Sequence, residues 1–231
     1  MKIIIVQWVK NHLHKNKDVS IRFDKSNHGS VRGQSLVEIT LLLPLLLIVV
    51  SGLLEFGFIL NEYLTVMDAA RNAARFSSDG MFTSRDGNHD CNSTADFFRQ
   101  SACVVIQELA QEQPNVSIDP DEGDDIIVSV FSVVSGTGVT ERHPGEYDER
   151  GWSYSLDLPG HGARERSSLI NTASVDNRLD ISAPNTGLLL IEVFYSYEQK
   201  LSLPWITAFV DDPVILHVYS FMPLVSAEPR E

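Results

Sequence analysis

The chain has 231 residues, of which 43% are hydrophobic, and a formal net charge of −13. This length allows one ordinary domain plus a smaller element, and the hydrophobic content excludes a wholly disordered chain. The acidic balance argues against nucleic acid as a partner, because binding to phosphates needs clustered Lys and Arg.

The charge is distributed unevenly along the chain. Residues 1–33 hold seven Lys or Arg and two Asp, a net charge of +5, which leaves −18 for the remaining 198 residues. Basic flanks stay on the cytoplasmic side of a membrane. The pattern therefore predicts a basic cytoplasmic leader at 1–33 and an acidic part on the other side.

A long apolar helix is predicted next. Residues 39–54 form an uncharged run of 16, and the apolar-rich stretch extends from Leu36 to Leu60. A membrane-spanning helix needs about 20 such residues. Helical spacing and a high Ala content continue to Phe76, so we expect one helix over 35–76, with a transmembrane first half and an amphipathic second half.

The rest of the chain predicts a small α+β domain with a mostly antiparallel sheet. A helix is expected at 94–113, before Pro114, and strands are expected at 125–134, 188–197 and 214–221. A short strand at 151–158 and a short helix at 167–179 are further expectations. The predicted organisation is a leader (1–33), a transmembrane or assembly helix (34–76) and an extracytoplasmic α+β domain (77–231).

The start of the apolar run resembles a prepilin processing site, with the sequence RGQSLVE at 32–38. In type IV pilin-like proteins a peptidase cuts after a glycine, and the new chain carries a glutamate at its fifth position. A cut between Gly33 and Gln34 makes Glu38 that residue. A carboxylate in lipid costs a few kcal/mol, and in such assemblies its partner is the new α-amino group of a neighbouring subunit. Alternatively, Glu38 reaches the interface at the helix start, where negative charge suits the helix dipole.

Two further residues in the apolar helix invite more than one interpretation. Pro44 removes a helical hydrogen bond and predicts a kink, which either helps helices pack in a filament or is neutral. Glu55 is either an acid at the lipid–water boundary or part of a helix–helix contact through the neighbouring Ser51, Gly52 and Gly57, since small residues let backbones approach.

Residues 31–76 as a whole resemble the N-terminal segment of TadE-like (TadE/TadG) pilus assembly proteins. The matching features are the RGQSLVE start, the leucine-rich run with its proline, the EFG element at 55–57 and the AARNAAR sequence at 69–75. The resemblance implies a minor pilin, or pseudopilin, of the tight-adherence secretion system, which builds Flp-type pili for attachment and biofilm. Flp pilins have a tyrosine after the glutamate, whereas this chain has Ile39.

The resemblance also implies partners and a location. The partners are other pilin or pseudopilin subunits, the prepilin peptidase, the inner-membrane assembly platform and membrane lipid. The location is the bacterial cytoplasmic membrane, with a single pass, the N-terminus in the cytoplasm and the C-terminal domain outside, or within an extracellular pilus.

Other candidate sites lie beyond the helix. Cys91 and Cys103 predict a disulfide if this side is oxidising; the alternative is two unpaired thiols. The acidic turn at 119–125 has some features of a calcium loop but lacks its full spacing and terminal Glu, so a solvated turn is favoured. We expect no metal or cofactor, and the scattered histidines form no catalytic motif.

Three functions are consistent with the sequence. The first is a minor pilin that takes part in assembly of a tight-adherence pilus. The second is an uncut, membrane-anchored adhesin or scaffold. The third, a membrane-tethered hydrolase, is the least favoured, and we expect no enzymatic activity.

Overall fold

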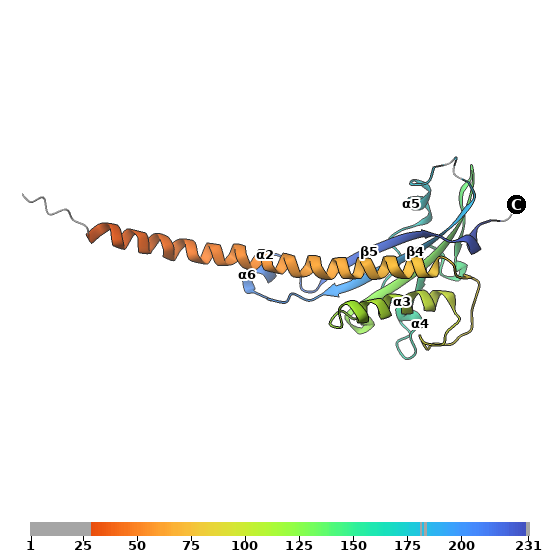
Figure 1. The fold of residues 1–231 in the computed structure, drawn as a ribbon, viewed down its shortest axis with the longest axis horizontal. Coiled ribbons are helices and arrows are strands. Elements are labelled where there is room, and N and C mark those ends of the chain that lie inside the picture. Colours follow the sequence, from red (N-terminus) through yellow and green to blue (C-terminus); the bar gives the residue numbers. More distant parts are fainter. Residues whose placement is uncertain (1–28, 181, 183, 230–231) are drawn as a thin grey trace, which may run out of the picture. The chain divides into compact units, whose positions relative to one another are not determined.

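The structure is a computed structural model, and it describes residues 29–180, 182 and 184–229, with side chains from Ser35 onward. The first 28 residues of the predicted leader lie outside this description. The longest element is helix α2, Gly29–Ser77, which continues through Pro44 without a break (Figure 1). The helix predicted at 35–76 is confirmed, and it begins earlier than expected.

The chain divides into two compact units, 1–47 and 48–231. In the first unit, the described side chains of α2 are all exposed, from Ser35 to Leu47. In the second unit, α2 has a buried face that includes Val66, Ala69 and Ala73. Over 35–77 the helix is long and apolar enough to cross a membrane.

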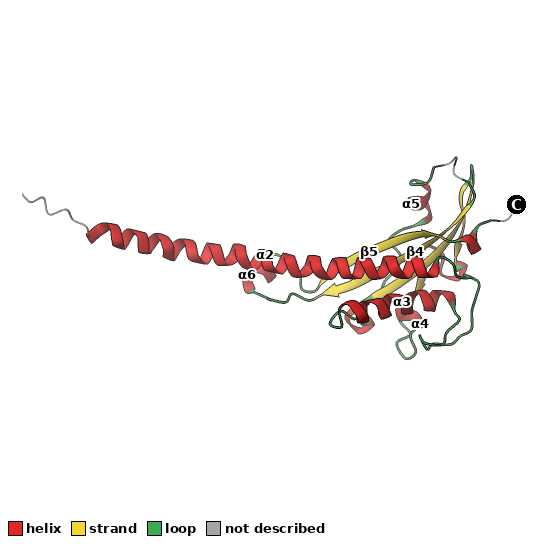
Figure 2. Cartoon of the chain, in the orientation of Figure 1, coloured by secondary structure: helices red, strands yellow, loops and turns green. Residues whose placement is uncertain are grey.

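The second unit is built on an antiparallel sheet (Figure 2). Its strands are β1 (Asp125–Val134), β2 (Gly138–His143), β3 (Trp152–Ser153), β4 (Thr186–Tyr197) and β5 (Val214–Pro223). Four of them follow the order β2-β1-β4-β5, and β3 pairs with β1 beside this path. Strands β1 and β4 are long, β-branched and buried, which explains their central position.

Helices and irregular segments cover both faces of this sheet. One face carries Val128, Ile191 and Tyr195, which join the main core together with α2 and with α3 (Phe97–Glu112). The other face carries Phe131 and Leu190, which form a smaller core beside α5 (Thr172–Asp176). The remaining elements are α4 (Tyr154–Asp157), α6 (Pro204–Thr207) and the 3-10 turns η1 (Pro120–Glu122), η2 (Gly145–Arg150) and η3 (Val225–Ala227).

The fold class predicted from the sequence, α+β with a long N-terminal helix and a mostly antiparallel sheet, is confirmed. The strand predicted at 125–134 has the observed bounds, and those at 188–197 and 214–221 are each slightly longer in the structure. The helix predicted at 94–113 begins at Phe97, because Asp96 caps it by accepting hydrogen bonds from two backbone amides of its first turn.

Two predictions in the middle of the chain are corrected. The segment 151–158 is a strand only at Trp152–Ser153 and then turns into α4, since the hydroxyl of Ser153 caps that helix by accepting from the amide of Leu156. The helix predicted at 167–179 is limited to Thr172–Asp176, after an Asn171 cap. Strand β2 was not predicted; its sequence, GVTERH, is polar because the strand lies at an edge of the sheet.

Candidate functional site

One face of α2 is polar where it meets the end of β4. The buried residues of this face recur at helical spacing: Ser51, Glu55, Glu62, Val66, Ala69 and Ala73. From Val66 onward the face is apolar and small, which lets the helix pack closely on the sheet. Before Val66 it carries two buried carboxylates, and each needs a partner from the same compact unit.

The carboxylate of Glu55 is fully used inside its own chain. Its Oε1 accepts from the hydroxyl of Tyr197 at 2.6 Å and from the backbone amide of Lys200 at 2.8 Å. Its Oε2 accepts from the backbone amide of Leu201 at 2.9 Å. Glu55 is 6% exposed. These bonds fasten the helix to the turn that follows β4.

Glu62 repeats this arrangement seven residues later. Its Oε2 accepts from the hydroxyl of Tyr195 at 3.0 Å, and its Oε1 lies 2.9 Å from Nζ of Lys200. Tyr195 and Tyr197 are two residues apart on β4, so both side chains point from the same face of the sheet toward α2. Lys200 thus contributes its backbone amide to Glu55 and its ammonium group to Glu62.

The two tyrosines remain protonated donors in this environment. Burial, together with the adjacent carboxylate of Glu62, raises the pKa of Tyr195 far above its usual value. Burial and the hydrogen bond to Glu55 raise the pKa of Tyr197 in the same direction. Each phenol therefore donates a hydrogen bond to its glutamate throughout the physiological pH range.

The structure adds in-chain partners to the interpretations of Glu55 made from the sequence. It shows a buried acid bound to β4 and the following turn, while an acid at the lipid–water boundary and a contact between helices stay predictions. Its partners could not be identified from the sequence, because Tyr197 is 142 residues away. The signal in the sequence was the presence of two acids, Glu55 and Glu62, on the face of α2 that is otherwise apolar, because buried acids need polar partners.

Glu38 differs from Glu55 and Glu62. It is exposed on α2, and among the described residues it makes no hydrogen bond or ion pair. The side chains around it are apolar and also exposed, including Leu36, Val37 and Ile39. Its carboxylate is therefore not engaged by the part of the chain that the structure describes.

The other residues predicted to act in processing and assembly also lie on α2. Pro44 is an exposed residue within the helix. The peptide bond between Gly33 and Gln34 also lies within the bounds of α2, Gly29–Ser77. Cleavage there would require the helix to unwind locally.

The family comparison concerns this same helix. A family model described as TadE-like protein matches residues 33–75. Over this segment, about a fifth of its length, the chain is similar to TadE-like proteins. The matched segment includes Glu38, Glu55 and Glu62, and it ends before the sheet domain. No curated protein and no solved structure matched the chain.

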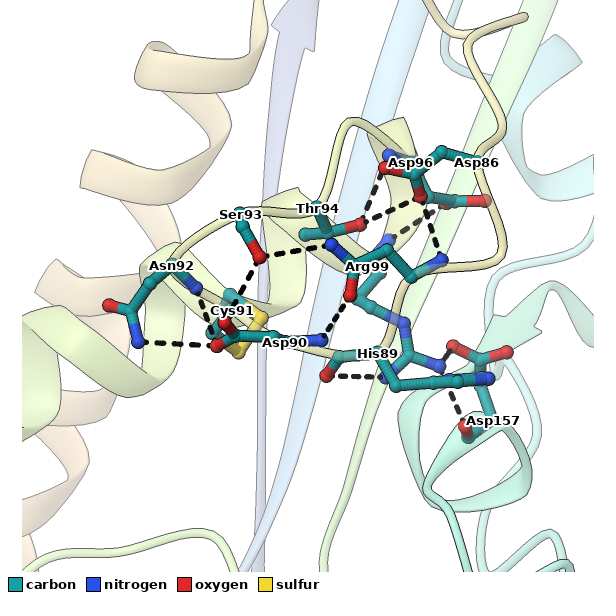
Figure 3. The surroundings of a disulfide bond; sticks show 12 residues. Asp86, His89, Asp90, Cys91, Asn92, Ser93, Thr94, Asp96, Arg99 and Asp157 are labelled. Atoms are coloured by element: carbon teal, nitrogen blue, oxygen red, sulfur yellow. Dashed lines mark hydrogen bonds and ion pairs between the residues drawn. A yellow bond between two sulfur atoms is a disulfide. The ribbon is translucent and has the colours of Figure 1, made fainter.

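Beyond the TadE-like segment, a disulfide connects the loop after α2 to α3. Cys91 is joined to Cys103, and the polar residues around it hold the loop in place (Figure 3). Asp86 accepts from the backbone amide of Ala95 and from the hydroxyl of Thr94. The buried Arg99 forms an ion pair with Asp157 of α4. The disulfide bond thus lies in a loop that hydrogen bonds and an ion pair also hold.

The carboxylates of the acidic turn at 119–125 are bound within the fold. Asp119 caps η1 by accepting from the amide of Asp121 at 3.0 Å, and Asp124 accepts from the backbone amide of Ser196. Asp125 is fully buried and accepts from the hydroxyls of Ser153 and Ser155. Within the described part of the chain, no group of three His, Cys, Asp or Glu is placed to hold a metal ion.

Proposed function

We propose that the chain is a membrane-anchored minor pilin, or pseudopilin, which takes part in assembly of a tight-adherence (Flp-type) pilus for surface attachment. The role is structural rather than catalytic. The partners are other pilin or pseudopilin subunits, the prepilin peptidase, the assembly platform of the inner membrane and membrane lipid. The chain crosses the bacterial cytoplasmic membrane once, with its N-terminus in the cytoplasm and its C-terminal domain outside.

The observation that carries this proposal is the exposed Glu38 within the TadE-like segment. Glu55 and Glu62 have hydrogen-bonding partners in their own chain, whereas Glu38 has none among the described residues. A carboxylate in an apolar environment costs a few kcal/mol unless a partner neutralises it. Cutting between Gly33 and Gln34 would create that partner, an α-amino group on a neighbouring subunit.

The experiment compares Glu38→Gln with Thr40→Val in cells that produce the pilus. Glu38→Gln removes the negative charge and Thr40→Val removes a hydroxyl, each with little change in shape. Among the described residues the hydroxyl of Thr40 bonds to the carbonyl of Leu36 in its own helix. Glu38→Gln should be inserted and processed normally, yet its amount in sheared pili should fall roughly ten- to a hundredfold, the value of one charge-assisted hydrogen bond. Thr40→Val should assemble as the wild type does, and normal pili with Glu38→Gln would refute the proposal.

A second candidate is an uncut, membrane-anchored adhesin or scaffold. It is favoured by one observation, the position of the Gly33–Gln34 bond within the bounds of α2. Under this alternative the leader stays attached and Glu38 has no amine to pair with. Glu38→Gln would then leave surface attachment unchanged.

A further inference from the structure

An apolar connector joins β4 to β5 in the sheet domain. Residues 201–210, LSLPWITAFV, contain no charged side chain and include the short helix α6. Phe209 is 90% exposed, and Trp205 and Val210 are also exposed. So many exposed apolar side chains on one short segment indicate a surface that is covered by something other than water.

The connector lies beside the apolar part of α2 (Figure 1). The indole Nε1 of Trp205 donates to the hydroxyl of Ser51 at 3.0 Å. Ser51 belongs to the uncharged run at 39–54. An apolar cavity of about 270 Å³ lies between the two segments, with Gly52 and Phe56 on the helix side and Ile206 on the connector side.

Polar bonds fix the base of the connector. The side-chain amide of Gln199 donates to the carbonyls of Val210 and Asp211, which closes the ends of the segment onto each other. At the same place, Glu55 accepts from the backbone amides of Lys200 and Leu201. Charged residues thus flank the connector on both sides, and the apolar segment lies between them.

We infer that the connector 201–210 inserts into the interfacial region of the outer leaflet of the same bilayer that α2 crosses, with lipid as its ligand. The inference rests on the proposed membrane anchor. Three observations support it: the connector is uncharged, it touches α2 within the uncharged run, and charges mark its ends. In this position Trp205 would place its apolar ring in lipid while its N–H donates to the hydroxyl of Ser51, as tryptophans at membrane interfaces do.

A second protein could in principle cover the same surface, but continuity with the span favours lipid. The connector begins beside Glu55, where α2 leaves its uncharged run, and Val210 at its end lines the same cavity as Glu55. Short amphipathic segments that lie in the membrane plane bury their apolar side into the boundary between headgroups and acyl chains. The cavity beside Gly52 offers an apolar surface to acyl chains.

The test uses spin labels on the full-length chain in liposomes. Its two cysteines form a disulfide, so a single introduced cysteine is the sole free thiol. Labels are placed by Phe209→Cys in the connector, by Val49→Cys in the span and by Val225→Cys as the control, since Val225 is 76% exposed and outside both. Each label is probed with oxygen, which partitions into lipid, and with a nickel chelate, which stays in water.

The expected result is an oxygen-to-nickel accessibility ratio several-fold higher at 49 and 209 than at 225. A ratio at 209 equal to that at 225, with a high ratio at 49, would overturn the inference and leave the membrane anchor standing. A low ratio at 49 would refute the anchor and the inference with it. A label at 209 that is shielded from both reagents would show that protein covers the connector, and would also overturn the inference.

Discussion

At the scale of single residues, α2 presents two kinds of glutamate. Glu55 and Glu62 are buried, and each is bound by a tyrosine of β4. Glu38 is exposed in an apolar stretch. Substitution of Glu55 or Glu62 should therefore lower the stability of the sheet domain, whereas substitution of Glu38 should weaken contact with a partner. Stability measurements separate these roles.

Glu55→Ala should destabilise the chain strongly. The change leaves the hydroxyl of Tyr197 and the amides of Lys200 and Leu201 without their acceptor, which should cost about 2–4 kcal/mol. Tyr197→Phe removes one donor alone and should cost about 1 kcal/mol. Thermal unfolding of the detergent-solubilised full chain, followed by near-ultraviolet circular dichroism, measures both effects.

The matched control for this series is Glu38→Ala. An exposed glutamate with no bond among the described residues should shift stability by less than about 0.5 kcal/mol when it is replaced. Equal melting temperatures for Glu55→Ala and Glu38→Ala would show that the buried hydrogen bonds do not hold the domain together.

Tyr195 should make the fold sensitive to alkaline pH. Because burial and Glu62 raise its pKa in the folded state, the folded chain keeps this proton above pH 10 while the unfolded chain loses it. Stability therefore falls as pH rises through the unfolded pKa, by at most about 1.4 kcal/mol per pH unit for this group. Tyr195→Phe should show a shallower fall in melting temperature between pH 9 and 11, and identical slopes for the two proteins would contradict this.

At the scale of elements, the extent to which a strand is buried decides how well it can be predicted from the sequence. Strands β1 and β4 have long β-branched and aromatic runs, so they could be predicted almost to their ends. Strand β2 is polar and lies at an edge of the sheet, where no apolar pattern is needed. The segment between β2 and β4 is held by side-chain hydrogen bonds, such as that of Ser168 to Glu192. Such bonds leave no periodic pattern in the sequence.

The candidate site shows the same limit. The position of Glu38 after a glycine and before an uncharged run is a local pattern, so the sequence predicts a special role for it. The role of Glu55 depends on Tyr197 and Leu201, which are 142 and 146 residues away, and no local pattern connects them. Only the antiparallel pairing of β4 with its neighbours brings these groups to α2.

The start of β4 offers a test of close packing between elements. A Cβ added at Gly187 would lie 2.1 Å from the carbonyl oxygen of Leu224, so the chain at η3 would have to move. Gly187→Ala should cost about 1–3 kcal/mol, as overpacking does. Gly145→Ala is the control, since nothing lies within 4 Å of the added atom. Comparable melting temperatures for the two variants would refute this account of the β4–η3 contact.

At the scale of the whole molecule, the chain combines a TadE-like helix with a sheet domain that the family match does not cover. The same helix contributes apolar exposed residues before Gly52 and a buried face after Thr65. One element thus supplies both the proposed assembly surface and part of the core of the domain. Assembly and folding should therefore respond to different substitutions on a single helix.

The most direct test of the proposed function is the N-terminus of the chain in the cell. Intact mass and N-terminal peptides would be determined for the protein recovered from membranes and from sheared pili, with a strain lacking the prepilin peptidase as the control. The proposed function predicts a chain that begins at Gln34 in both fractions, and a longer chain in the control strain. Recovery of the chain with Met1 to Gly33 still attached in peptidase-containing cells would contradict it.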